Sequence, residues 1–389
     1  HTTLASRRDR QRECARQGRD VRSKSLSVVH GDVVAVHPTD LDIAAGEIFA
    51  ILGPAAAGKS SLLRAVAGHL APALGRILIG GADVTDLAPE RRPTVAVLTD
   101  PALLPHLSVA DNAAFGLEAR GIPRAVRRAR TRDLLAIFGL AERGDHRPDG
   151  LADADRRRVA LARAAAVEPA VLLLDEPFTG LDLADRRRLR VELKALHRRT
   201  GATVVLTATD PDDVLALADR VAVMIAGRIE QIDTPDRLYD RPATAAVARC
   251  LGENNLLPGR VVEIRGARVA VDTAVGRLWA TTALPLAPGT AVELAVRPER
   301  LLLDGERALR GLAEIDASGW NRLVGELVGR TLDGPTLTYD FAVADTRLRL
   351  LRPNLGSRDR LLPSLHAIGF HADDVLVFPA DERGGGDDG

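Results

Sequence analysis

Residues 53–60 read Gly-Pro-Ala-Ala-Ala-Gly-Lys-Ser, which matches the pattern G-x-x-x-x-G-K-[ST] of a phosphate-binding loop. The glycines allow the backbone to curl so that successive N–H groups point at phosphate oxygens. Lys59 can reach the terminal phosphates, and the Ser60 hydroxyl can bind a magnesium ion. We therefore expect this chain to bind a nucleotide together with magnesium.

The segments on either side of this loop have the patterns that such a site requires. Residues 47–52 are apolar and rich in strand-forming side chains, and residues 61–67 have helical spacing. A strand, a glycine loop and a helix in this order place phosphate at the N-terminus of the helix. The sequence therefore predicts the α/β fold of a P-loop NTPase.

The composition is that of a folded protein with more than one domain. The chain has 389 residues, of which 46% are hydrophobic and 27% charged, and it is longer than a single core usually allows. Its formal net charge is zero, which argues against a nucleic-acid binder with a wholly basic surface. Two cysteines, Cys14 and Cys250, provide neither a disulfide framework nor metal-ligand spacing. No apolar run approaches the roughly 20 residues of a membrane-spanning helix.

The pattern of the sequence divides the chain into four segments. Residues 1–24 are rich in Arg and lack apolar periodicity, so we expect a disordered extension, with an arm for anionic surfaces as the alternative. Residues 25–250 alternate strand-like and helical stretches, and residues 100–165 within them form a helical insertion. Residues 251–380 consist of short alternating runs that predict a small all-β barrel. Residues 381–389 form a flexible tail.

A second motif supplies carboxylates for hydrolysis. Residues 171–178 read Val-Leu-Leu-Leu-Asp-Glu-Pro-Phe, a buried strand that ends in two acids. Asp175 can contribute to the coordination shell of a magnesium ion, and Glu176 can polarise the attacking water. Phosphoryl transfer depends on positioning and charge neutralisation more than on covalent chemistry. The two acids and Lys59 are therefore the types of side chain that ATP hydrolysis requires.

Together these motifs make the chain resemble the ATP-binding subunit of an ABC transporter. The resemblance covers about residues 25 to 375. Its C-terminal part, residues 251–259 and 296–301, is similar to the regulatory β-domain of bacterial importers of polyamines, ferric iron, phosphonates and sugars. The matching segments of the N-terminal part are residues 53–61, 103–112, 158–164, 173–178 and 180–182.

The resemblance implies an ATPase that energises a bacterial importer through ATP-driven closure of a dimer. The partner would be a second ATPase subunit, identical or different, and the two would dock under membrane permeases through residues near 104–112 and the helical insertion. This implies a cytoplasmic protein, peripheral on the inner face of the cell membrane. No nucleic acid is expected as a partner, because the β-domain favours importers over repair or translation proteins of the family.

The resemblance also implies a site that binds ATP and Mg²⁺. Its catalytic residues would be Glu176, Lys59 and Asp175, and its metal ligands Ser60 and Asp175. His30 aligns with the aromatic residue that stacks on adenine in the family, although imidazole stacks less well. The complete nucleotide-binding set would be His30, Gly53, Pro54, Ala55, Ala56, Ala57, Gly58, Lys59, Ser60 and Ser61.

Three motifs of the family are altered. The family's signature Leu-Ser-Gly-Gly-Gln aligns with residues 151–155, Leu-Ala-Asp-Ala-Asp. A separate glutamine of the family, which senses magnesium and the attacking water, aligns with Thr99, and the family's switch histidine aligns with Thr209. In the family the signature contacts the γ-phosphate of the opposite subunit. A carboxylate about 5 Å from a phosphate charge is opposed by roughly 3 kcal/mol at an effective dielectric of about 20. We expect Asp153 and Asp155 to cap the following helix and also to weaken phosphate sensing.

These changes bear on hydrolysis more than on binding. Loss of one donor to the reacting phosphate typically lowers the rate ~10²–10³-fold. The alternative to a working motor is therefore a catalytically weakened ATP-binding subunit that acts as a structural or regulatory partner.

Two groups of side chains receive ordinary structural explanations. We expect Arg156, Arg157 and Arg158 to form the solvated face of a helix, as runs of charge usually do. We expect Phe115, Phe138 and Phe178 to pack in the core.

Overall fold

The computed structural model describes residues 18–303, 319–356 and 364–380. The chain divides into two compact units between Asp240 and Arg241. Most of the predicted N-terminal extension and the predicted tail 381–389 lie outside the described residues. Strand β1 (Val21–His30) begins inside the segment 1–24 that the sequence assigned to the extension, so the folded unit starts earlier than expected.

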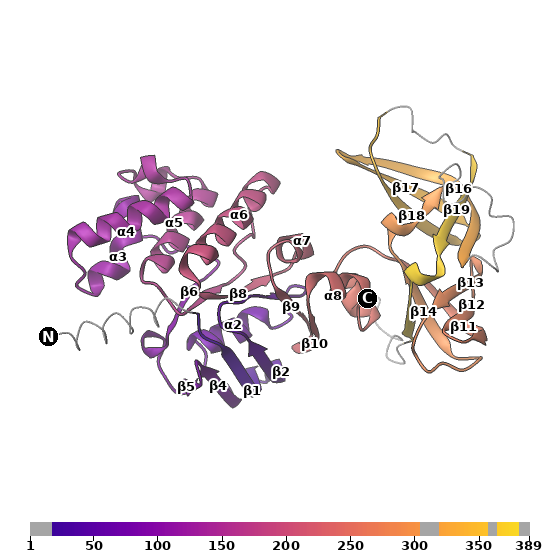
Figure 1. Cartoon of the computed structure of the whole chain (residues 1–389), viewed down its shortest axis with the longest axis horizontal. Coiled ribbons are helices and arrows are strands. Elements are labelled where there is room, and N and C mark those ends of the chain that lie inside the picture. Colours follow the sequence, from indigo (N-terminus) through magenta and orange to yellow (C-terminus); the bar gives the residue numbers. More distant parts are fainter. Residues whose placement is uncertain (1–17, 304–318, 357–363, 381–389) are drawn as a thin grey trace, which may run out of the picture. The chain divides into compact units, whose positions relative to one another are not determined.

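A six-stranded sheet carries the N-terminal unit (Figure 1). Strands β3 and β7 are buried along their whole length, which explains their uninterrupted apolar runs. The strands from β9 to β6 pair in parallel, whereas β10 pairs with β9 antiparallel. The order is β10 (Arg228–Asp233), β9 (Arg220–Ile225), β3 (Ile48–Leu52), β8 (Thr203–Ala208), β7 (Val171–Leu174) and β6 (Thr94–Val97).

Strand β6 corrects one detail of the prediction. Residues 94–98 read Thr-Val-Ala-Val-Leu, a short apolar run that predicts a buried strand, but every residue of β6 is only half-buried. The reason is its place at the edge of the sheet, beyond β7, where one side of the strand has no paired strand among the described residues. The carboxyl ends of the parallel strands, including the end of β6, face the same edge.

A smaller antiparallel sheet covers the other side of the phosphate-loop helix. Helix α2 (Lys59–Ala67) contacts strands of both sheets, and one apolar cluster joins them through Phe49, Leu62 and Leu26. The helix is therefore held from both sides. The order of this sheet is β2 (Val33–Ile43), β1 (Val21–His30), β4 (Leu74–Ile79) and β5 (Ala82–Asp83).

Helices form the expected insertion in the N-terminal unit. α3, α4 and α5 pack on one another, and α6 packs against α4 and α5 (Figure 1). Phe138 and Phe178 are buried as predicted, but Phe115 on α3 is 45% exposed, which contradicts its assignment to the core. The α-helices of this unit within residues 18–240 are α2, α3 (Val109–Ala119), α4 (Arg124–Ile137), α5 (Asp153–Ala166), α6 (Leu183–Thr200), α7 (Pro211–Leu215) and α8 (Pro235–Asp240). Within the described part of the chain, none of the helices is both long and apolar enough to span a membrane.

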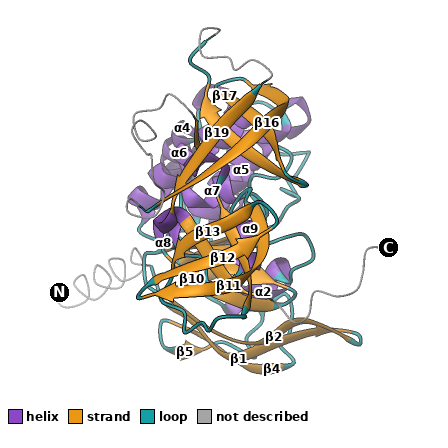
Figure 2. Cartoon of the chain, turned by 90° about the vertical axis from the view of Figure 1, so that its right-hand side faces the viewer, coloured by secondary structure: helices purple, strands orange, loops and turns teal. Residues whose placement is uncertain are grey.

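The C-terminal unit consists mainly of strands (Figure 2). Two five-stranded sheets share one apolar core, to which Tyr339, Phe341 and Phe370 contribute. Helix α9 (Ala245–Cys250) packs against Phe378 and Ala295 of this unit. The first sheet is β13 (Gly276–Thr281), β12 (Arg268–Thr273), β11 (Asn255–Arg265), β14 (Ala291–Val296) and β20 (Val375–Pro379). The second is β15 (Leu302–Leu303), β19 (Leu365–His371), β16 (Trp320–Asp333), β17 (Thr336–Val343) and β18 (Thr346–Pro353).

The architecture confirms the predicted fold class. The N-terminal unit has an α/β core with a helical insertion, and the C-terminal unit is built from β-sheets. The α9 packing explains why the division between the units precedes residue 250, since Ala245 and Ala248 belong to the apolar cluster of the C-terminal unit.

A buried arginine closes the C-terminal end of the phosphate-loop helix. The guanidinium of Arg92 donates to the carbonyls of Ala65 (2.7 Å) and Val66 (2.9 Å) at the end of α2. It also donates to the carbonyls of Thr85 (2.8 Å) and Leu87 (2.9 Å). These carbonyls lie at the helix end and in turns, and that of Ala65 also accepts the N–H of Gly68 at 3.1 Å. A cation at this end of α2 suits the helix dipole.

We predict that Arg92→Met lowers the free energy of unfolding of the N-terminal unit by about 3 kcal/mol, because four carbonyls lose a charged donor. Denaturant unfolding followed by circular dichroism measures this change. Arg91→Met is the matched control, since Arg91 is exposed and adjacent. Equal stability of the two variants would contradict the structural role of Arg92.

Candidate functional site

Two glycines set the path of the phosphate loop between β3 and α2. A Cβ atom on Gly53 would lie 2.0 Å from the carbonyl oxygen of Met224, and one on Gly58 would lie 2.1 Å from that of Ala35. Gly58 also has φ +97°. Larger residues are therefore excluded at both ends of the loop, and the loop lies against the backbone of neighbouring strands.

The interior of the loop carries backbone strain. Ala56 has φ +61°, a left-handed conformation that costs an L-residue about 1–2 kcal/mol. Such outliers persist where the surrounding structure holds them, and they concentrate at functional sites. The loop conformation is thus maintained against the preference of its own residue.

Lys59 points back into this loop. Its Nζ donates to the carbonyls of Gly53 (2.9 Å) and Pro54 (2.8 Å) and lies 3.4 Å from Glu176 Oε1. The side chain is only 4% exposed. The ammonium group therefore lies between the loop and the acids that follow β7, which is the arrangement predicted for Lys59 and Glu176.

Asp175 is the centre of the polar contacts at the end of β7. Its Oδ1 accepts hydrogen bonds from Ser60 Oγ (2.7 Å) and Thr207 Oγ1 (2.9 Å). Its Oδ2 is buried and has no hydrogen-bond partner among the described residues, and the Arg64 guanidinium lies 3.7 Å away. A buried carboxylate oxygen without a hydrogen bond, next to a serine hydroxyl, is a donor set that suits Mg²⁺. The residues present therefore fit the predicted metal.

Glu176 is held in an unusual conformation. Its φ is +49°, and its N–H donates to Thr207 Oγ1 at 2.9 Å. Its Oε2 accepts a hydrogen bond from Thr179 Oγ1 at 2.7 Å. Both the backbone and the carboxylate of Glu176 are thus fixed by hydroxyl groups.

Thr207 is a residue of this site that the sequence reasoning did not identify. It is fully buried in β8 and contacts both Asp175 and Glu176. The available signal was a hydroxyl residue near the carboxyl end of a strand of the α/β core whose other residues, apart from Thr203, are apolar. Parallel strands place such a residue beside the acids at the end of the neighbouring strand, which is β7.

The two altered sensor positions lie at the same edge of the sheet. Thr99 follows the end of β6 and Thr209 follows the end of β8, and both are exposed. At the other side of the loop, His30 ends β1, and its Nε2 lies 3.0 Å from Ser61 Oγ. The structure thus brings His30 next to the loop.

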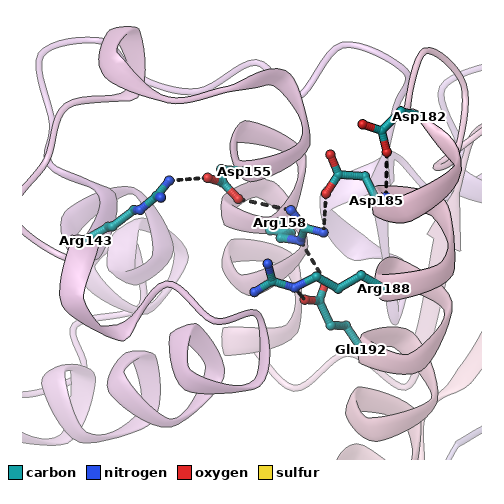
Figure 3. A network of polar contacts seen from close by, with 7 residues as sticks. All are labelled: Arg143, Asp155, Arg158, Asp182, Asp185, Arg188 and Glu192. Carbon is teal, nitrogen blue, oxygen red and sulfur yellow. Dashed lines mark hydrogen bonds and ion pairs between the residues drawn. The ribbon is translucent and has the colours of Figure 1, made fainter.

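The acids of the altered signature are paired with arginines. Asp153 forms an ion pair with Arg156, and this contact lowers the pKa of Asp153. Asp155 pairs with Arg143 and, at 3.0 Å, with Arg158 (Figure 3). The expectation that these acids cap α5 by side-chain hydrogen bonds is wrong, because the N-cap is Ala152 and makes no such bond. The acids lie in the first turn, where they suit the helix dipole.

Arg158 corrects a second expectation. It is 2% exposed rather than solvated, and it binds Asp155, Asp185 (2.9 Å) and Glu192 (2.8 Å) (Figure 3). Glu192 also binds Arg188. The network ties the start of α5 to α6, and a buried guanidinium with three carboxylate partners is fully compensated. The sequence alone shows a run of three arginines and does not distinguish the buried one.

The chain is similar in sequence to a known protein family and to curated proteins of bacteria. The family described as ABC transporter matches residues 36–179. The spermidine/putrescine import ATP-binding protein PotA of Acidothermus cellulolyticus is 41% identical over 295 residues, which cover 74% of this chain and 77% of that protein. The protein of the same name from Pseudomonas fluorescens is 36% identical over 347 residues, which cover 85% of this chain and 89% of that protein.

Two solved structures are similar to the chain as well. cbiO1 from Clostridium perfringens, part of the ABC transporter complex cbiONQ, has a TM-score of 0.53 and 29% identity, covering 57% of this chain and 90% of that one. The dimeric structure of MJ0796, a bacterial ABC transporter cassette, has a TM-score of 0.51 and 25% identity, covering 55% of this chain and 98% of that one.

One acid near the site has a strongly altered pKa. Asp213 on α7 is buried, and burial raises its pKa to about 6, helped by the charge of Asp210 and opposed by Arg186, which lies 3.3 Å away. An unfolded aspartate has a pKa near 3.9. Between about pH 4 and pH 6 the folded chain therefore binds a proton that the unfolded chain has lost, so stability falls as pH rises through this window.

We predict that Asp213→Asn makes the N-terminal unit more stable than the parent at pH 8 by up to about 3 kcal/mol, and equally stable at pH 4. Unfolding by urea at both pH values measures this difference. Asp212→Asn is the control, because Asp212 is exposed on the same helix. A less stable Asp213→Asn variant at pH 8 would mean that the pair with Arg186 outweighs the cost of burial.

Proposed function

The chain belongs to the ATP-binding subunits of ABC transporters of the importer type and is an ABC-type ATPase, and on this premise we propose that it energises the import of a polyamine. The proposal for the solute rests on relatives that are named spermidine/putrescine import ATP-binding proteins. Selection of the solute itself belongs to other subunits. The chain would act as a dimer, bound at the inner face of the cell membrane beneath its permeases.

The observation that carries this proposal is the convergence at the end of β7. Lys59 from α2, Ser60 beside it and the acids Asp175 and Glu176 lie within contact of one another. The backbone N–H groups of residues 53–60 and the Lys59 ammonium would hold the phosphates of ATP. The loop is already shaped for this by its glycines, so little reorganisation is needed on binding.

The metal ligands would be Ser60 and Asp175. The Oδ1 of Asp175 is shared by two hydroxyls, which fixes the carboxylate and leaves Oδ2 for the ion. A magnesium ion bound there would neutralise charge on the phosphate oxygens. His30 would lie against the adenine, since it borders the loop at Ser61.

Glu176 would polarise the attacking water. A general base must be held within reach of the proton that it accepts, and Thr179 and Thr207 hold this residue on two sides. Its carboxylate also lies near Lys59. These contacts orient Glu176 before nucleotide arrives.

The alternative, an ATP-binding subunit with weakened hydrolysis, is favoured by the residues at the altered motifs. Thr99 and Thr209 are too short to replace a glutamine or an imidazole at the phosphate. The ion pairs of Asp153 and Asp155 act in the opposite direction, because they compensate the charges that were expected to repel ATP. We therefore keep active hydrolysis as the proposal.

The steady-state ATPase rate of the purified chain tests this function. We predict turnover near ~1 per second, which Glu176→Gln lowers at least ~100-fold while ATP binding persists. Glu90→Gln is the control, because Glu90 is exposed and distant in sequence from Glu176.

A variant that restores the family's residues at the three altered motifs distinguishes a working ATPase from a weakened subunit. If the parent has negligible turnover and the restored chain is active, the chain is a weakened subunit and the proposal fails. The restored chain carries Thr99→Gln, Thr209→His, Ala152→Ser, Asp153→Gly, Ala154→Gly and Asp155→Gln.

A further inference from the structure

An arginine of α5 reaches the loop that follows the two acids. Arg157 donates through Nη1 to the carbonyl oxygens of Pro177 (2.9 Å) and Thr179 (2.5 Å). Burial lowers the pKa of Arg157, so its guanidinium has given up part of its hydration to make these contacts. Arg157 therefore connects the start of α5 to the loop next to Glu176.

The same loop contacts the Glu176 side chain. Thr179 donates its hydroxyl to Glu176 Oε2 at 2.7 Å, and its N–H to the Glu176 carbonyl at 3.2 Å. A chain of contacts thus runs from the Arg157 guanidinium through Thr179 to the Glu176 carboxylate. Each link is a hydrogen bond, and the first is made by a charged donor.

Packing alone does not hold this loop. Thr179, Gly180 and Leu181 line a cavity of about 440 Å³, together with Arg157 and Asp153 of α5. The loop therefore borders a cavity on one side. Hydrogen bonds from Arg157, and from Arg186 Nε to the Leu181 carbonyl (3.2 Å), help to fix its position. Glu176 has a left-handed backbone, which also requires outside support. Thr207 supplies that support to the Glu176 N–H, and Thr179 supplies it to the carboxylate.

We propose that Arg157 is a positioning residue for ATP hydrolysis, acting through Thr179 on the carboxylate of Glu176. This rests on the proposed role of Glu176 in polarising water. Arg157 contacts neither Glu176 nor the phosphate loop directly in the described structure. It would therefore affect hydrolysis by orienting the Glu176 carboxylate. It also provides a route by which events at the start of α5 reach the hydrolytic site.

The test compares, at Thr179 and at Arg157 of the full chain, one variant that removes the hydrogen-bond donors of the side chain with one that keeps a similar group. Thr179→Val removes the hydroxyl while keeping the shape, and Thr179→Ser keeps the hydroxyl. Arg157→Met keeps the aliphatic length without donors, and Arg157→Lys keeps a cation. Arg132→Met, at an exposed position on α4, is the matched control. The measurements are kcat and KM for ATP, and ATP affinity by calorimetry with the hydrolysis-deficient Glu176→Gln background.

We expect Thr179→Val and Arg157→Met each to lower kcat about tenfold or more with ATP affinity unchanged, because misplacing a reacting group affects the chemical step. Thr179→Ser restores the parent rate. The double variant is no slower than the slower single variant, since both act through one carboxylate. Parent-like kcat in Thr179→Val or Arg157→Met, or a loss of ATP affinity that accounts for the whole effect, would overturn the proposal.

A readout independent of hydrolysis separates this proposal from the proposed function. Amide hydrogen exchange in the free chain reports the N–H groups of Thr179 and Leu181, which bond to the carbonyls of Glu176 and Phe178. Arg157→Met should speed exchange there several-fold, and Arg132→Met should not. If the parent binds ATP without turnover, the proposed function fails, and unchanged exchange in Arg157→Met would overturn the positioning role. If Arg157→Met does not fold, Arg157→Lys and the Thr179 pair decide the question.

Discussion

The rest of the site depends on one oxygen atom, Oδ1 of Asp175. It accepts hydrogen bonds from Ser60 at the start of α2 and from Thr207 in β8, so it joins the phosphate loop to two strands of the sheet. The second oxygen of Asp175 is buried and has no hydrogen-bond partner within the part of the chain that the structure describes. The Arg64 guanidinium lies 3.7 Å from this oxygen, beyond hydrogen-bond distance, so a bound magnesium ion would supply the direct partner that the buried oxygen lacks.

Arginines connect the parts of the N-terminal unit that surround this atom. The chain has fifty arginines and three lysines, and α5 uses its arginines for different purposes. Arg158 is buried among carboxylates of α5 and α6, while Arg157 holds the loop after β7. Arg163 donates to the carbonyls of Pro101 (2.7 Å) and Ala102 (2.9 Å) in the loop after β6. One helix therefore contacts both loops at the reactive edge of the sheet, through planar groups with several donors.

The sequence was sufficient for the parts of the fold that depend on local pattern. The phosphate loop, its strand and helix, and the strand that ends in Asp175 have strong periodicity or an unmistakable motif. It was not sufficient where tertiary contacts decide. Arg158 and Arg157 belong to one run of charge, and only packing against α6 separates the buried residue from its neighbours. Thr207 is an ordinary strand residue until the parallel pairing of β7 and β8 places it beside the acids.

Magnesium dependence of ATP affinity tests the account of Asp175 most directly. Calorimetry would compare the parent with Asp175→Asn, in the presence of Mg²⁺ and of a chelator. We predict that Mg²⁺ tightens ATP binding to the parent by about tenfold or more, and that Asp175→Asn loses this gain while it binds metal-free ATP as the parent does. A full magnesium effect in Asp175→Asn would contradict the assignment of the free carboxylate oxygen to the metal.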